Sequence, residues 1–135
     1  MAISTRTYRT PVGELLLGAY DGALCLCDWK YRRMRTTVDA RIQRALQADY
    51  AEGASPVIDR AIAELDAYFA GSLQVFSVPV LLVGSDFQQR VWRALQSIPY
   101  GATVNYAQLT AMVAEPTAVR AVAAANGANA TIAVS

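Results

Sequence analysis

Few residues of this 135-residue chain could do covalent chemistry. The chain contains no histidine, and its two cysteines are Cys25 and Cys27. Without histidine, Ser-His-Asp catalysis, Cys-His catalysis and histidine-ligated metal sites are excluded within these residues. On one strand the two cysteines share a face, but pairs at this spacing rarely meet disulfide geometry. We therefore expect two apolar thiols in a sheet, and we predict no catalytic residue, no metal site and no cofactor.

The composition is that of a folded chain with little net charge. The sequence is 54% hydrophobic and 17% charged, and its formal net charge is +1. These values fit one domain or two very small ones, and they oppose strong nonspecific attraction to nucleic acid from charge alone. No apolar run approaches the roughly 18–20 residues of a membrane span, and the first residues do not resemble a secretory signal. We expect a cytoplasmic protein with no membrane partner.

The first third of the sequence predicts an antiparallel sheet of three strands. Ser4–Tyr8 alternates in character, Glu14–Tyr20 is an apolar run of strand length, and Ala23–Trp29 returns after Asp21-Gly22. Asp-Gly between two such runs is one of the strongest short-range signals for a β-hairpin.

Two helices and a linker follow. Apolar residues at helical spacing predict helices over residues 37–48 and over Ile58–Phe69, with Ala51–Pro56 between them as a loop. Val78–Val83 predicts a short extended segment, and Pro79 should confine it to a sheet edge or a linker because proline cannot donate a ladder hydrogen bond. We place a boundary here, with one sub-domain over residues 1–80 and another over 81–135.

The second sub-domain predicts helices only. Ser85 with Gln88, and Asn105 with Gln108, have the form of capping boxes that begin helices. A tight turn separates the second helix from a third over residues 117–126. A helix, a short turn and a helix form a helix-turn-helix candidate, so the whole chain is predicted to be α+β.

The third predicted helix is poor in polar side chains. Arg120 and Asn126 alone could read bases, whereas a helix in the major groove needs several such residues. Its small residues would allow close approach to a groove, with Arg120 as the single probe. The alternative is that the scarcity of polar side chains reflects an alanine-rich helix packed into a core, with no role in DNA binding.

Three segments carry a resemblance to a known family. They are Phe87–Leu95, Ile98–Leu109 and Ala118–Val122. Together they resemble the DNA-binding half of the O6-alkylguanine-DNA alkyltransferases, and the turn at Pro11-Val12-Gly13 with the following hairpin resembles the family's ribonuclease-H-like N-terminal sub-domain. The resemblance implies a DNA-repair transferase that enters the minor groove, rotates an alkylated guanine out of the stack and moves its alkyl group to a protein cysteine.

The resemblance also implies roles for four residues of the helix-turn-helix. Tyr106 would press on the phosphate beside the rotated nucleotide, and Arg120 would fill the space that the base leaves. Ala118 and Ala121 would let the helix approach the floor of the groove.

Two further positions complete the predicted DNA-binding residues. Asn129 matches the family's hinge asparagine, which ties the helix end to the active-site strand. Gln88 is a candidate phosphate contact, although a helix cap explains it equally well.

The resemblance fails at the nucleophile. In the family, an apolar strand leads from the hinge asparagine into Pro-Cys-His-Arg, whereas these residues run through Thr131–Val134 to Ser135. Serine without a base is a poor nucleophile, and alkyl transfer needs a thiolate. We therefore expect an incomplete second sub-domain without catalytic activity. Its uncovered edge predicts lower stability or self-association.

Four functional hypotheses remain open from the sequence. The chain is a catalytically inactive relative, with weak or lost binding to duplex DNA that carries O6-alkylguanine, or it is a non-enzymatic lesion-binding protein. Alternatively it is a helix-turn-helix regulator, or a fragment of an active methyltransferase. Whether it is an enzyme, and which lesions it would accept, the sequence leaves open.

Overall fold

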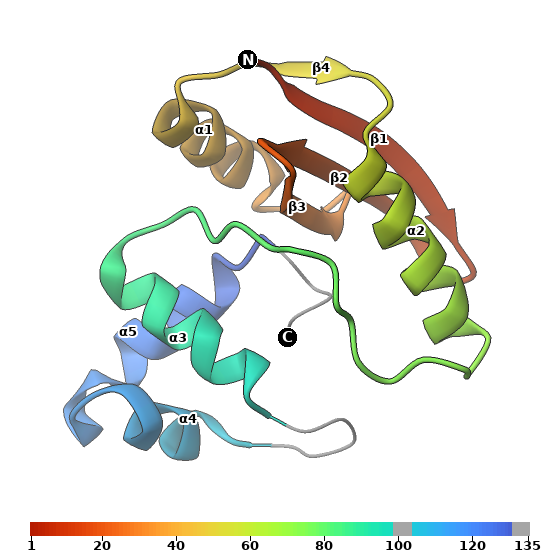
Figure 1. Cartoon of the computed structure of the whole chain (residues 1–135). Coiled ribbons are helices and arrows are strands. Elements are labelled where there is room, and N and C mark those ends of the chain that lie inside the picture. Colours follow the sequence, from red (N-terminus) through yellow and green to blue (C-terminus); the bar gives the residue numbers. More distant parts are fainter. Residues whose placement is uncertain (99–103, 131–135) are drawn as a thin grey trace.

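The computed structural model describes residues 1–98 and 104–130, and Figure 1 shows the path of the chain. The elements in chain order are β1 (Ile3–Thr10), β2 (Gly13–Tyr20), β3 (Ala23–Trp29), α1 (Arg35–Leu46), β4 (Tyr50–Glu52), α2 (Pro56–Phe69), α3 (Asp86–Gln96), α4 (Tyr106–Val113), the 3₁₀ turn η1 (Pro116–Ala118) and α5 (Val119–Gly127). This order confirms the predicted α+β class. Among the described residues, no helix has the length and apolar character needed to cross a membrane.

The sheet has the order β3-β2-β1-β4. The three predicted antiparallel strands are present, and β4 adds a short parallel strand beside β1. The prediction of a loop over Ala51–Pro56 is wrong at its first two residues, which pair with Ser4 and Thr5, and at Pro56, which begins α2. The strand is only three residues long and largely exposed, so it has no apolar alternation that a sequence could show.

A β-bulge in β3 separates the two cysteines. Gly18 pairs with Leu26, but the next residue of β2 pairs with Leu24. Cys25 is therefore an extra residue, and a bulge of this kind reverses which side chains face which side. Cys25 packs in the cluster on the α1 side of the sheet, and Cys27 packs in the cluster on the α2 side. The prediction that the cysteines share a face is wrong for this reason.

The two helices of the first half cover opposite faces of the sheet (Figure 1). Apolar residues of α2 at helical spacing pack against alternate residues of β2. The apolar residues of α1 pack on the other face of the sheet, where Leu16 and Tyr20 of β2 point. The α2 cluster contains Leu15, Leu17, Ala19, Leu24, Cys27, Val57, Ile58, Ala61, Leu65 and Val78. The α1 cluster contains Ile3, Cys25, Leu26, Val38, Ile42, Val83 and Ala130.

The outer edge of β3 is partly covered by segments from the second half of the chain. The backbone N–H of Leu24 donates to the Pro79 carbonyl at 2.8 Å, and that of Cys27 donates to the Ala130 carbonyl at 2.7 Å. The prediction of an extended edge segment around Pro79 is confirmed. Thr131–Val134 lies outside the described residues, so self-association through it stays a prediction, as does the division at residue 80.

Helices α3, α4 and α5 form a core of their own around Trp92. The buried members of this core are Val91, Trp92, Leu109, Val122, Ala125 and Ala128. Trp92 is 1% exposed, and its indole N–H donates to the Ala125 carbonyl at 2.8 Å. The third helix, predicted from residue 117, begins with the 3₁₀ turn η1 and becomes α-helical at Val119.

The position of Trp92 requires a glycine just before α3. A Cβ atom added at Gly84 would lie 2.5 Å from the ring atom Cη2 of Trp92 and 2.6 Å from Oε1 of Gln88. Since the ring is buried and hydrogen-bonded, it has no free space to move into. The close approach of the backbone to the indole is therefore a constraint on residue 84.

We expect the substitution Gly84→Ala to lower the free energy of unfolding by about 1–3 kcal/mol, because the extra methyl overpacks the Trp92 ring. Gly53→Ala is the matched control, since a Cβ at Gly53 meets no atom within 4 Å. It should change the free energy by less than about 0.5 kcal/mol. Urea unfolding followed by circular dichroism measures both. Equal effects of the two substitutions would contradict the constraint.

Candidate nucleic-acid interface

The start of α4 is fixed by a reciprocal cap. The backbone N–H of Gln108 donates to Oδ1 of Asn105 at 2.8 Å, and the N–H of Asn105 donates to Oε1 of Gln108 at 2.8 Å. This confirms the predicted capping box and makes Tyr106 the first helical residue. The residue is 48% exposed, and its phenol stands at a helix N-terminus, where backbone N–H groups favour a phosphate.

The hydroxyl of Tyr106 lies beside the far end of α5. The amide Nδ2 of Asn126 donates to the Tyr106 hydroxyl at 3.4 Å. The start of α4 and the last turns of α5 are therefore neighbours on one surface. Both residues are candidates for DNA contact from the sequence, but the sequence gives no sign that they touch each other.

One side of α5 is exposed and almost free of large side chains. Its exposed residues are Val119, Arg120, Ala121, Ala124 and Gly127. Arg120 is the only charged residue among them, and the other side of the helix packs into the Trp92 core. Such a surface brings a helix backbone close to a groove while a guanidinium reaches further in.

The remaining predicted residues lie at different depths. Ala118 is half-buried in η1, and Ala121 is exposed one turn later. Gln88 caps α3: its Oε1 accepts from the N–H of Ser85 at 3.0 Å, and its own N–H donates to the Ser85 hydroxyl at 3.1 Å. The capping explanation of Gln88 is confirmed, and its phosphate contact stays a prediction.

Asn129 lies where α5 joins the sheet. Its side chain is buried, its backbone N–H donates to the Asn126 carbonyl, and the next residue pairs with β3 through Cys27. The hinge role of Asn129 stays a prediction. The position does not place this side chain on the exposed face of α5.

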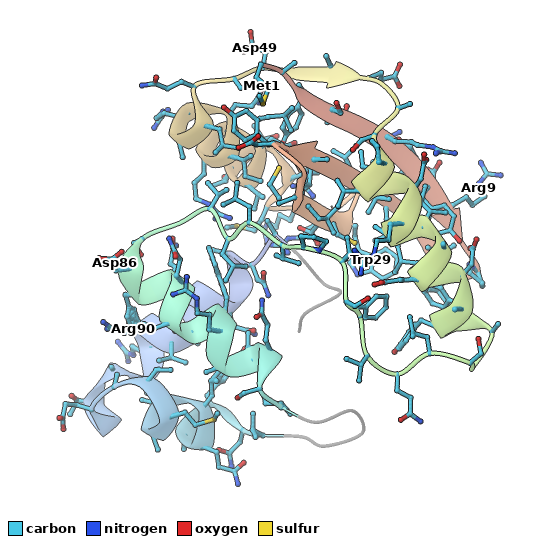
Figure 2. The ribbon with its side chains drawn as sticks, viewed as in Figure 1. Met1, Arg9, Trp29, Asp49, Asp86 and Arg90 are labelled. Carbon is cyan, nitrogen blue, oxygen red and sulfur yellow. The ribbon has the colours of Figure 1, made fainter. Side chains whose placement is uncertain are left out.

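The helical part has few charges to offer a polyanion. From Ser85 onward the sequence holds three arginines and two acidic residues, so the net charge is +1. Asp86 and Arg90 both lie on α3 (Figure 2), and the guanidinium of Arg90 lies 5.5 Å from the centre of the Phe87 ring. A net charge of +1 can contribute little affinity for phosphates, so helix N-termini and hydroxyls are the other groups of this part that can bind them.

Both thiols lie in the sheet and not on the exposed side of α5. Cys25 and Cys27 are buried on opposite faces of the sheet, and burial raises the pKa of the Cys25 thiol to about 11. A protonated, covered thiol is a poor nucleophile. Across residues 1–98 and 104–130, no three acidic or cysteine side chains gather to hold a metal ion. Ser135 lies outside the described residues.

Two arginines of the first half reach the helical part, and the sequence had pointed to neither. Arg32 donates to the backbone carbonyls of Gly127 and Asn129, which lie 95 and 97 residues further along the chain. The guanidinium of Arg41 lies 5.3 Å from the centre of the Trp92 ring. No local pattern could reveal contacts over such separations.

Comparison with known proteins gives matches over almost the whole chain. Residues 86–135 match the family model of the 6-O-methylguanine DNA methyltransferase DNA-binding domain. A methylated-DNA–protein-cysteine methyltransferase of Mycolicibacterium paratuberculosis is 39% identical over 130 residues, which cover 94% of this chain and 71% of that protein. The constitutive enzyme of Bacillus subtilis is 35% identical over 131 residues, which cover 91% of this chain and 71% of that protein.

Solved structures agree with these matches. The crystal structure of Mycobacterium tuberculosis O6-methylguanine methyltransferase is similar with a TM-score of 0.77 and 36% identity, covering 98% of this chain and 75% of that one. The structure of the M. tuberculosis protein in complex with DNA gives a TM-score of 0.78 and 37% identity, with coverages of 97% and 74%.

We expect neither thiol of the folded protein to react readily with Ellman's reagent at about pH 8, because both are buried and Cys25 keeps its proton. Both should react at once in concentrated guanidinium chloride. For Cys25 the labelling rate of the folded protein should keep rising with pH toward about 11, where its thiolate forms. The variants Cys25→Ala and Cys27→Ala show which labelling rate belongs to which thiol. Fast labelling of the folded protein at neutral pH would show an accessible thiolate and contradict this description.

Proposed function

Because this chain belongs to the methylated-DNA–protein-cysteine methyltransferase family, we propose that it binds double-stranded DNA through the surface formed by α4 and α5. The observation that carries the proposal is the exposed side of α5, where Arg120 stands alone among small residues. A helix without a set of base-reading side chains is poorly suited to the major groove, and the small residues suit close approach in the minor groove.

In this proposal each residue of the surface has a physical task. Tyr106 holds a phosphate at the N-terminus of α4, with its hydroxyl oriented by Asn126. Arg120 enters the duplex and occupies the space of a guanine that has rotated out, since a planar guanidinium stacks between bases. The small side chains of Ala118 and Ala121 let the helix approach the floor of the groove closely. The rotated base that the family's chemistry addresses is an O6-alkylguanine.

We propose in addition that these 135 residues recognise the lesion without accepting its alkyl group. Transfer forms a bond from a thiolate sulfur to the alkyl carbon and breaks the bond from that carbon to O6 of guanine. Cys25 and Cys27 are the only sulfur nucleophiles of this type in the sequence, and both are buried in the sheet. The contribution of these residues would then be lesion binding, in the manner of a non-enzymatic alkyltransferase-like protein. We propose a cytoplasmic location for the chain.

We expect Arg120→Ala to weaken binding to a short duplex with a central O6-methylguanine by roughly 10-fold, because the inserted guanidinium is lost. Fluorescence anisotropy at fixed salt measures the dissociation constant, since the affinity for DNA depends on ionic strength. Arg9→Ala is the matched control. It removes the same charge from the far end of β1, where the side chain points away from the helices (Figure 2). Equal losses for both variants would mean that charge alone binds the DNA.

We expect no gain in intact mass when the protein is incubated with an excess of duplex carrying O6-methylguanine. Each thiol is covered, so the displacement at the methyl carbon has no nucleophile. A family member with an accessible reactive cysteine serves as the positive control for the DNA. A stoichiometric gain of one methyl group on this chain would overturn the proposal that it binds without transfer, and peptide mapping would identify the acceptor.

A further inference from the structure

A fully buried carboxylate lies where the sheet meets the helical part. Asp28, near the end of β3, is 0% exposed. Its Oδ1 accepts from the backbone N–H of Trp29 at 2.9 Å, and its Oδ2 lies 2.9 Å from Arg32 and 3.2 Å from Arg35. A buried carboxylate is tolerated only when it is paired and hydrogen-bonded. Asp28 is therefore the shared ion-pair partner of both guanidinium groups.

Arg32 connects Asp28 with the end of α5. Its Nη1 donates to the Asn129 carbonyl at 3.1 Å, and its Nη2 donates to the Gly127 carbonyl. Gly127 is the last residue of α5 and Asn129 lies two residues beyond it, and α5 has no basic residue in its own last turn. The last carbonyls of a helix lack intrahelical donors and carry partial negative charge. A guanidinium from the other half of the chain satisfies both needs.

The same helix end is held from α3. The Trp92 indole donates to the carbonyl of Ala125, which lies two and four residues before the residues whose carbonyls Arg32 contacts. Arg41 of α1 lies over the Trp92 ring and donates to the Val83 carbonyl at 3.1 Å. Burial lowers the pKa of Arg41, but an arginine stays charged in a protein. The C-terminal end of α5 is thus fixed directly by Arg32 and indirectly by Arg41.

We propose that Arg32, oriented by Asp28, is a positioning residue for DNA binding: it sets the C-terminal end of α5 and thereby how Arg120 is presented to the duplex. This inference rests on the proposed function. None of the predicted DNA contacts lies in the sheet, but through Asp28 of β3 the sheet would influence the affinity for DNA.

The neighbouring residue separates positioning from simple attraction of phosphates. Arg32 is 21% exposed, and its guanidinium is engaged by a carboxylate and two carbonyls. Arg33 is exposed and carries the same charge at the next position. If charge near the interface governs the affinity, Arg33 matters at least as much as Arg32. If positioning governs it, Arg32 matters and Arg33 does not.

The test compares Arg32→Ala, Arg32→Lys and the control Arg33→Ala in the full chain. Arg32→Ala leaves Asp28 paired with Arg35, so we expect a folded protein, which circular dichroism verifies. We expect duplex affinity to fall about 10-fold for Arg32→Ala and to stay within about 2-fold for Arg33→Ala. Arg32→Lys should recover part of the loss, because a lysine keeps the charge but cannot contact three acceptors in one plane.

A double-mutant cycle with Arg120→Ala tests whether the effect passes through α5. If Arg32 acts by positioning Arg120, removing Arg120 should cost less affinity in the Arg32→Ala background than in the unmodified chain. Additive losses would mean that Arg32 contacts DNA by itself, and this would overturn the positioning role. Equal affinities of Arg32→Ala and Arg33→Ala would overturn it as well.

Amide hydrogen exchange provides a measurement that does not depend on DNA. We expect the amides of residues 125–129 to exchange about 10-fold faster in Arg32→Ala than in Arg33→Ala, because the helix end loses its cap. Unchanged exchange at these amides overturns the inference whatever the DNA data show. Failure of the unmodified chain to bind any duplex overturns the proposed function, and exchange then still decides whether Arg32 fixes α5.

Discussion

The hydrogen bond from the Trp92 indole to the Ala125 carbonyl is the interaction on which the helical part depends. A ring that is 1% exposed must find an acceptor for its N–H inside the protein, and this acceptor lies on α5. The bond holds α5 against α3, so that the small residues of α5 face outward. The backbone at Gly84 passes so close to the same ring that a Cβ atom there would clash with it.

The surface that results depends on shape more than on charge. Tyr106 and Asn126 connect the start of α4 with the last turns of α5, and Arg120 is the only charged residue on the exposed side of α5. With a net charge of +1 from Ser85 onward, counterion release contributes little to affinity. In the proposed complex, close fit in a groove, helix N-termini and the guanidinium of Arg120 supply the affinity that charge does not. The account of DNA binding therefore stands on geometry.

Features set by near neighbours in the chain were predictable from the sequence. The capping boxes at Ser85 and Asn105 involve residues three apart, and the hairpin at Asp21-Gly22 follows from turn chemistry. The bulge at Cys25 was not predictable, because it depends on how β2 and β3 pair. Nor was the contact of Arg32 with the end of α5, since an arginine four residues after an aspartate gives no sign of a partner 95 residues away.

The most direct test of the account is to titrate the isotopically labelled protein with duplex DNA and follow backbone amide resonances by NMR. The account predicts that the largest shifts fall on the start of α4 and on η1 and α5, around Tyr106 and Arg120, while amides in the middle of β1 and β2 stay unchanged. Shifts centred on the strands or on α2, with α5 unaffected, would contradict the claim that this chain binds DNA through α4 and the exposed side of α5.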